Sequence, residues 1–207
     1  MKTDPEILKH LLSKGSLLPQ EEMLEIAPKK GQLFIGIPKE TFFQERRVAL
    51  VPEAVSILVL HGHRVKIESK SGEMANFSDR DYSEAGAEIC YDPKEVFECD
   101  MIFKVGPPSE EEIDMMKGNQ TLVSALQITI SAKAILQKLM QKKITAIAWD
   151  YIRDDKGVFH IVRAMSEIAG TTSILIAGEL LSCYSTGKGI MLGGITGFRP
   201  AEVVVIG

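Results

Sequence analysis

The sequence predicts an α/β fold: a mostly parallel sheet flanked by helices, flavodoxin-like or Rossmann-like, followed by the start of a Rossmann domain. The first observation is that short β-rich runs alternate with helical patterns of about ten residues, as in strands joined by right-handed crossovers. The second is the C-terminal run Val203-Val204-Val205-Ile206-Gly207, which is typical of a strand entering the first glycine of a phosphate-binding turn. The sequence is therefore expected to be the amino-terminal part of a larger protein.

Composition narrows the class of protein. The 207 residues are 45% hydrophobic and 25% charged, with a formal net charge of -4, as in an ordinary globular protein. The chain has no excess of basic residues of the kind that would indicate nucleic-acid binding. Its apolar runs are too short to span a bilayer, so a cytoplasmic location is expected. Cys90, Cys99 and Cys183 are scattered and lack C-x-x-C spacing, which favours reduced structural thiols over disulfides or a metal site.

Three domains are expected along the chain. Residues 1–32 are predicted to be a helical appendage, residues 33–164 a substrate-binding α/β domain, and residues 165–207 a connecting helix with the first strand of a truncated NAD-binding domain. Within the appendage, residues 4–30 have the pattern of two short helices, because Asp4-Pro5 supplies a cap and a first-turn proline.

The first half of the α/β domain contains three predicted strands. Residues 33–37 are a buried apolar run, residues 64–68 alternate like a half-exposed strand, and residues 100–105 form a strand ended by Gly106 and two prolines. Helices are predicted between them. They are residues 52–61, which begin with a proline, and residues 78–85, which end before Gly86.

The second half continues this alternation. Ser109 begins an acidic helix with Glu112 at the capping-box spacing. Residues 121–126 and 144–149 are predicted strands on either side of a helix at 131–142. Ser166 is expected to cap a further helix, reaching to Tyr184, whose small and apolar residues suit a connector between domains or an oligomer contact.

Ligands bind such sheets at the carboxyl ends of the strands, so polar residues there are the candidates for a site. Arg46 and Arg47 follow the first strand, and one guanidinium of the pair can face the crevice and bind a substrate carboxylate through two parallel hydrogen bonds. A surface ion pair of this arginine with Glu40 or Glu45 is the alternative. Later strand ends carry further polar side chains, at Lys104, Gln127 and Asp150.

These residues together resemble a known family. The block Ile37-Pro38-Lys39-Glu40-Thr41, followed by Glu45 and Arg47-Val48-Ala49, closely resembles the N-terminal signature of the alanine dehydrogenase and transhydrogenase alpha-subunit family. Further similar segments follow in the same order to the end of the chain. They are Phe103-Lys104-Val105, Met165-Ser166-Glu167-Ile168-Ala169-Gly170 and Met191-Leu192-Gly193-Gly194, of which the last two resemble alanine dehydrogenase most.

The resemblance implies an NAD-dependent oxidoreductase that interconverts L-alanine with pyruvate and ammonium. It implies NAD as cofactor, a small amino acid or 2-keto acid as substrate and a homo-oligomer. It assigns substrate binding to Arg47 and Lys104, the catalytic positions to Gln127 and Asp150, and cofactor contacts to Ser166 and Gly207. No metal is expected, and the chain alone is expected to be inactive.

Two positions depart from the family pattern. Gly106 stands where the family has a substrate-contacting lysine, and Gln127 stands where it has the acid-base histidine. Glutamine cannot shuttle a proton near neutral pH but can donate a hydrogen bond to a keto oxygen. His160 and Arg163 are further candidates. The alternatives that remain are a transhydrogenase-like role, a different amino or keto acid, and a non-catalytic binding module.

Overall fold

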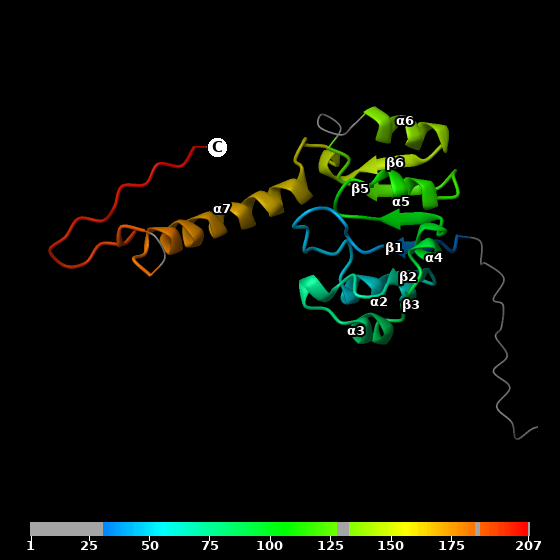
Figure 1. Cartoon of the computed structure of the whole chain (residues 1–207), viewed down its shortest axis with the longest axis horizontal. Coiled ribbons are helices and arrows are strands. Elements are labelled where there is room, and N and C mark those ends of the chain that lie inside the picture. The colour runs from blue at the N-terminus through cyan, green and yellow to red at the C-terminus, as the bar shows by residue number, and fades with distance from the viewer. Residues whose placement is uncertain (1–30, 128–132, 185–186, 207) are drawn as a thin grey trace, which may run out of the picture. The chain divides into compact units, whose positions relative to one another are not determined.

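The computed structural model describes residues 31–127, 133–184 and 187–206, and its centre is a six-stranded, all-parallel sheet. The expected α/β class is thereby confirmed. The strands and the order in which they lie are β3(Glu88–Cys90), β2(Arg64–Glu68), β1(Phe34–Ile37), β4(Met101–Phe103), β5(Thr121–Ser124) and β6(Thr145–Ala148). Figure 1 shows them stacked in this order, from β3 at the bottom to β6 at the top.

Helices connect these strands. They are α2(Pro52–Leu60), α3(Asp79–Glu84), α4(Pro93–Phe97), α5(Glu110–Met115), α6(Lys133–Gln141) and α7(His160–Leu181), with the 3₁₀ turns η1(Glu73–Ala75) and η2(Trp149–Tyr151). Ser78 and Ser109 form capping boxes at the starts of α3 and α5, as their sequence predicts. The predicted helices at residues 4–30 lie outside the described residues.

Two apolar clusters cover the two faces of the sheet. Ile35 and Ile37 of β1 pack in one cluster with Val55 of α2 and Tyr82 of α3. On the opposite face, Ile102 of β4 belongs to a second cluster formed with residues of α4, α5 and α6, which are Phe97, Ile113, Met116 and Leu139. Successive strand residues point to opposite faces, so β4 contributes Phe103 to the first cluster and Ile102 to the second.

The order of the strands reverses between β1 and β4. The chain adds β2 and β3 on one side of β1, then returns to place β4, β5 and β6 on the other side. At such a switch point the loops after the two central strands separate, and this opening is where ligands bind in open parallel sheets. The loops that follow β1 and β4 carry Arg47 and Lys104.

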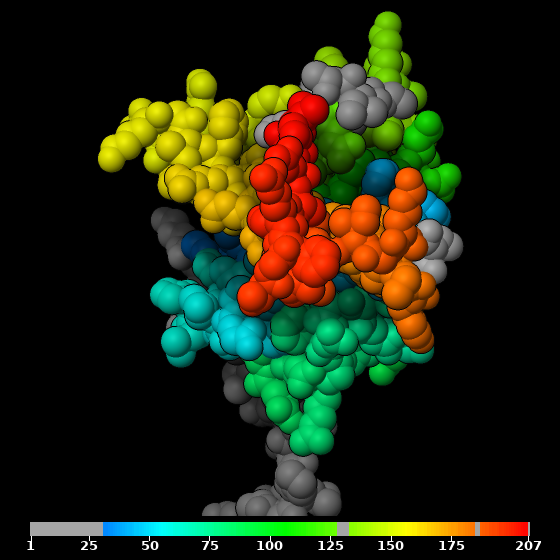
Figure 2. Space-filling view, turned by 90° about the vertical axis from the view of Figure 1, so that its left-hand side faces the viewer, coloured from blue at the N-terminus to red at the C-terminus, as the bar shows by residue number. Residues whose placement is uncertain are grey.

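One expectation about the C-terminal part is wrong. Ser166 does not cap a helix, because α7 begins at His160 and the Ser166 hydroxyl donates to the carbonyl of Val162 inside it, at 2.9 Å. Residues 201–206 form no strand, and Val204 and Ile206 are 84% and 94% exposed. This C-terminal segment is the red run in Figure 2. A strand needs a neighbouring strand for its backbone hydrogen bonds, and this segment has none among the described residues.

Candidate functional site

The candidate site lies at the carboxyl ends of the strands and consists of two adjoining cavities. The Phe103 cavity, of about 310 Å³, is lined by Arg47, Val48, Ala49, Leu50, Phe103, Lys104, Val105, Val123, Trp149, Ile161 and Met165. The Asp150 cavity, of about 340 Å³, is lined by Arg47, Ala125, Gln127, Trp149, Asp150, Val162, Met165, Ser166 and Ala169. Arg47, Trp149 and Met165 line both cavities.

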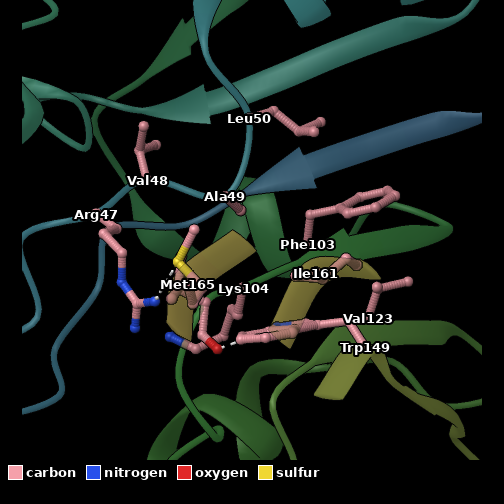
Figure 3. Close-up of a pocket in the computed structure, with 11 residues that line it drawn as sticks. Arg47, Val48, Ala49, Leu50, Phe103, Lys104, Val123, Trp149, Ile161 and Met165 are labelled. Carbon is pink, nitrogen blue, oxygen red and sulfur yellow. Dashed lines mark hydrogen bonds between the residues drawn. The ribbon is translucent and has the colours of Figure 1, made fainter. Parts of the chain in front are cut away.

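Arg47 is held by an ion pair while it lines both cavities. Its Nε and Nη2 donate to the two carboxylate oxygens of Glu45 at 2.7 and 2.6 Å, and Nη1 contacts the Met165 sulfur at 3.4 Å (Figure 3). The hydrogen bonds from Arg47 lower the pKa of Glu45, and the bond from Glu45 raises the pKa of Arg47. Both groups are therefore charged near neutral pH.

The ion pair leaves part of the guanidinium free to bind a ligand. A guanidinium has five N–H donors, and Glu45 uses one on Nε and one on Nη2. The remaining donors on Nη1 and Nη2 lie along one edge, which is the geometry for a second carboxylate. Thioether sulfur is a weak acceptor, so a carboxylate can readily take the place of Met165 at Nη1. The sequence left two alternatives for Arg47, binding of a substrate carboxylate or an ion pair with a neighbouring glutamate. The guanidinium has enough donors for both at once.

Lys104 lines the Phe103 cavity, and its ammonium belongs to a buried network of charged side chains. Its Nζ is 2.8 Å from Glu112 and 3.3 Å from Glu40, and the Lys104 side chain is 1% exposed. Glu40 also accepts the backbone N–H groups of Val105 and Gly106. The ammonium is thus bound by protein carboxylates, and it joins the loop after β1 to the end of β4 and the start of α5.

The space beside Gly106 is occupied by the same loop. A Cβ placed at this position would lie 3.3 Å from the Cβ of Phe42 and 3.4 Å from a carboxylate oxygen of Glu40. A longer side chain here would need both neighbours to move. Glycine at this position is therefore matched to the way in which the β1–α2 loop packs on the end of β4.

Gln127 and Asp150 lie in the Asp150 cavity, at the ends of β5 and β6. Gln127 is exposed and has φ 44°, a left-handed conformation that is uncommon for a residue other than glycine and that recurs at functional sites. One carboxylate oxygen of Asp150 is buried and has no hydrogen-bond partner among the described residues. Buried carboxylate oxygens are normally paired, so this atom is available to a cationic or N–H donor.

Trp149 forms a wall that the two cavities share. Strand β6 runs directly into η2, which places Trp149 and Asp150 next to each other at the strand end. The indole Nε1 donates to the carbonyl of Val105 at 3.2 Å and thereby fixes the ring (Figure 3). Trp149, Met165 and Ile161 were not among the predicted site residues, although an aromatic residue at a strand end was a usable signal.

Of the other candidate residues, His160 and Arg163 lie outside the two cavities. His160 pairs with Asp154 at 2.9 Å, and Arg163 pairs with Glu167 one helical turn away at 2.9 Å. Neither His160 nor Arg163 lines either cavity. Ser166 lines the Asp150 cavity, and Gly207 lies outside the described residues.

A cluster with metal-ligand atoms lies away from these cavities. Ligand atoms of Glu88, Cys90 and Glu95 lie within 4.8 Å of one another. Lys66 is 3.5 Å from both carboxylates and Arg64 is 3.5 Å from that of Glu88, so protein cations already balance their charge. This arrangement is a surface ion-pair network.

The described residues do not fit a dinucleotide pyrophosphate. Such a site needs a glycine-rich turn that leads directly into a helix, so that backbone N–H groups face the phosphates. The helices described with their preceding turns begin after Val51, Ser78, Asp92, Ser109 and Phe159, and none of these turns has that pattern. In addition, no helix in the described ranges has both the length and the hydropathy needed to cross a bilayer.

Comparison with known proteins gives a consistent result. Residues 36–169 match the family model described as alanine dehydrogenase/PNT, N-terminal domain. The alanine dehydrogenase of Methanococcus maripaludis is 39% identical over 176 residues, covering 84% of this chain and 47% of that protein. That of Bacillus subtilis is 36% identical over 175 residues, covering 84% and 46%. The chain thus spans about half the length of these relatives.

Solved structures agree with this comparison. An L-alanine dehydrogenase superposes with a TM-score of 0.77 at 36% identity, covering 81% of this chain and 46% of that chain. A transhydrogenase from Sinorhizobium meliloti gives a TM-score of 0.54 at 25% identity, covering 59% and 37%. The chain therefore belongs to the alanine dehydrogenase/PNT family, through its N-terminal domain.

Proposed function

We propose that this chain supplies the substrate-binding part of an NAD-dependent oxidoreductase of the alanine dehydrogenase type, which interconverts an L-amino acid such as L-alanine with its 2-oxo acid and ammonium. The observation that carries the proposal is that a basic and an acidic side chain line the same cavity. Arg47 and Asp150 both line the Asp150 cavity. An amino acid zwitterion carries the complementary charges on two groups bonded to the same carbon.

Each residue has a defined task in this proposal. The free edge of Arg47 binds the substrate carboxylate, and the unpaired oxygen of Asp150 accepts a hydrogen bond from the ammonium of the amino acid. Gln127 donates a hydrogen bond to the oxo group of the keto acid, since its amide cannot transfer a proton. Lys104 acts indirectly, by joining Glu40 and Glu112 and so fixing the loop that carries Arg47.

The same proposal covers the organisation of the enzyme. Residues 33–164 form the substrate domain, with residues 1–32 as an appendage, and residues 165–207 lead to the NAD-binding domain, where Ser166 and Gly207 contact the cofactor. The described residues do not fit the pyrophosphate, so binding of that group depends on other residues. We further propose a cytoplasmic homo-oligomer. It follows only from the family resemblance of the sequence.

Calorimetric titration of the chain with pyruvate and with L-alanine tests the role of Arg47. We expect Arg47→Gln to weaken binding about 100-fold, because two charge-assisted hydrogen bonds are lost. Arg46→Gln is the matched control, because Arg46 is exposed and lines neither cavity, and it should bind like the wild type. Equal affinities for Arg47→Gln and the wild type would contradict the proposal.

A non-catalytic binding module is the alternative, and turnover separates it from the enzyme. A protein that joins this chain to an NAD-binding domain should oxidise NADH when pyruvate and ammonium are supplied, and Arg47→Gln should abolish that activity. Tight binding of both NADH and the acid without turnover would favour the binding module.

A further inference from the structure

The Phe103 cavity is larger and more apolar than an alanine side chain requires. Apart from Arg47 and Lys104 its lining residues are apolar, and the Lys104 ammonium is bound to Glu112 and Glu40. Figure 3 shows Arg47 at one end of the cavity, with Leu50 and Phe103 toward the other end. A ligand held by the guanidinium thus has an apolar space within its reach.

The volume of this cavity sets the size of its occupant. It measures about 310 Å³. An apolar cavity of roughly 150 Å³ in another protein is sufficient to bind benzene. The methyl group of alanine or pyruvate would leave most of the space unfilled, whereas a branched aliphatic or aromatic side chain would fill it. Apolar burial favours the larger group, because affinity grows with the apolar area that is removed from water.

The two cavities divide a ligand into a polar and an apolar part. They share Arg47, Trp149 and Met165, so one molecule can occupy both. Its charged end faces Asp150 and Gln127, and its side chain points toward Phe103. Trp149 is fixed by its bond to Val105, while Met165 is an unbranched side chain that can adjust to different shapes.

We propose that the site prefers L-amino acids and 2-oxo acids with a branched aliphatic or aromatic side chain over L-alanine and pyruvate, with the Phe103 cavity as the side-chain subsite. This inference rests on the proposed function, since it takes Arg47 as the carboxylate anchor. Phe103, Val123, Trp149 and Ile161 determine the specificity.

The chain provides its own probe for this test. Trp149 is the one tryptophan in the sequence and lines both cavities, so quenching of its emission reports occupancy directly. The ligands are pyruvate, 2-oxobutanoate and 4-methyl-2-oxopentanoate. Each additional buried carbon should tighten binding about fourfold, so the last acid, with three more carbons, should bind about 60-fold more tightly than pyruvate. Calorimetry on the same series checks the dissociation constants.

A substitution that fills the Phe103 cavity tests whether it is the side-chain subsite. Val123→Phe should abolish the preference for the longest acid, so that it binds no more tightly than pyruvate does. Ala49→Val is a milder filling change, for use if Val123→Phe does not fold. Leu60→Phe adds similar bulk at an exposed position of α2 outside both cavities, and should keep the full preference.

The outcomes separate this inference from the proposed function. If pyruvate binds as tightly as the longer acids and Arg47→Gln still abolishes binding, the side-chain subsite is overturned and the proposed function stands. If Val123→Phe retains the preference, the Phe103 cavity is not the subsite. If no acid in the series binds, the proposed function fails together with the inference.

Discussion

Arg47 combines a structural contact with a free binding edge. Glu45, whose side chain is 10% exposed, holds one side of the guanidinium and so fixes its direction without an added ligand. A side chain already fixed in place loses less conformational entropy when a ligand binds. The ion pair with Glu45 therefore prepares the arginine for a carboxylate.

Lys104 joins the loop after β1 to the end of β4 and the start of α5. Its network holds one ammonium against two carboxylates, which also accept hydrogen bonds from Thr41, Val105, Gly106 and Ser109. Sequence reasoning placed Lys104 at a strand end and in the site. It could not identify its partners, because Glu40 lies 64 positions earlier in the chain and no local pattern joins the two.

Substituting Lys104 by methionine should destabilise the chain strongly. Two buried carboxylates would lose their cation, and breaking such a network typically costs about 3–5 kcal/mol. Urea denaturation measures the free energy of unfolding. Lys104→Met combined with Glu112→Gln should recover part of the loss. Lys117→Met, which breaks an exposed pair with Glu98, is the control and should change stability by less than about 1 kcal/mol. Equal effects of the two methionine variants would show that the network is not structural.

At the scale of elements, local sequence signals predicted helix starts well where a capping residue is present. Ser78 and Ser109 satisfy backbone donors within their own helix turns, so three or four residues contain the whole signal. The start of α7 was missed because Phe159 provides no side-chain cap. Ser166 was then chosen as the nearest capping residue, more than one turn too late. The strands β1, β4, β5 and β6 were predicted from their short apolar runs, and β2 from its alternation of polar and apolar residues.

The close contact between β1 and α4 depends on Gly36. A methyl group at this position would collide with the backbone carbonyl of Val96. We expect Gly36→Ala to destabilise the chain by about 1–3 kcal/mol, because α4 must move away from the sheet. Thermal and urea denaturation measure the loss.

Gly170 provides the matched control for this prediction. It lies inside α7, and a Cβ there would meet no atom within 4 Å. Gly170→Ala should be neutral or stabilising by up to about 1 kcal/mol, because alanine has the higher helix propensity. A neutral Gly36→Ala would show that α4 does not pack closely on β1.

At the scale of the whole molecule, two buried thiols make the free energy of unfolding depend on pH in the alkaline range. Burial raises the pKa of Cys90 and of Cys99 from 9.0 to about 11. The folded chain holds these protons more tightly than the unfolded chain. The resulting stabilisation is complete below pH 9 and is lost as the pH rises toward 11.

The urea midpoint at about pH 8 and about pH 10.5 tests this dependence. The double variant Cys90→Ala, Cys99→Ala should lose less stability between the two pH values than the wild type does. Cys183→Ala is the control, because this thiol is exposed, and it should follow the wild type. If the double variant shows the same loss as the wild type, the two thiols are not the cause.

The topology of the whole chain explains where the site lies. The order of the strands reverses between β1 and β4, which are hydrogen-bonded neighbours, and the segments that follow these two strands carry Arg47 and Lys104. The parallel sheet was predictable from alternating segments. The order of its strands was not, because it depends on contacts between residues far apart in sequence. The apolar wall around Trp149 follows from that order and was missed for the same reason.

The most direct test of the central claim is a crystal structure of the chain with a 2-oxo acid bound. We predict that the carboxylate of the acid lies about 2.8 Å from Nη1 and Nη2 of Arg47, with Met165 displaced and the pair with Glu45 intact. An acid bound elsewhere, with Arg47 still in contact with Met165, would contradict the account.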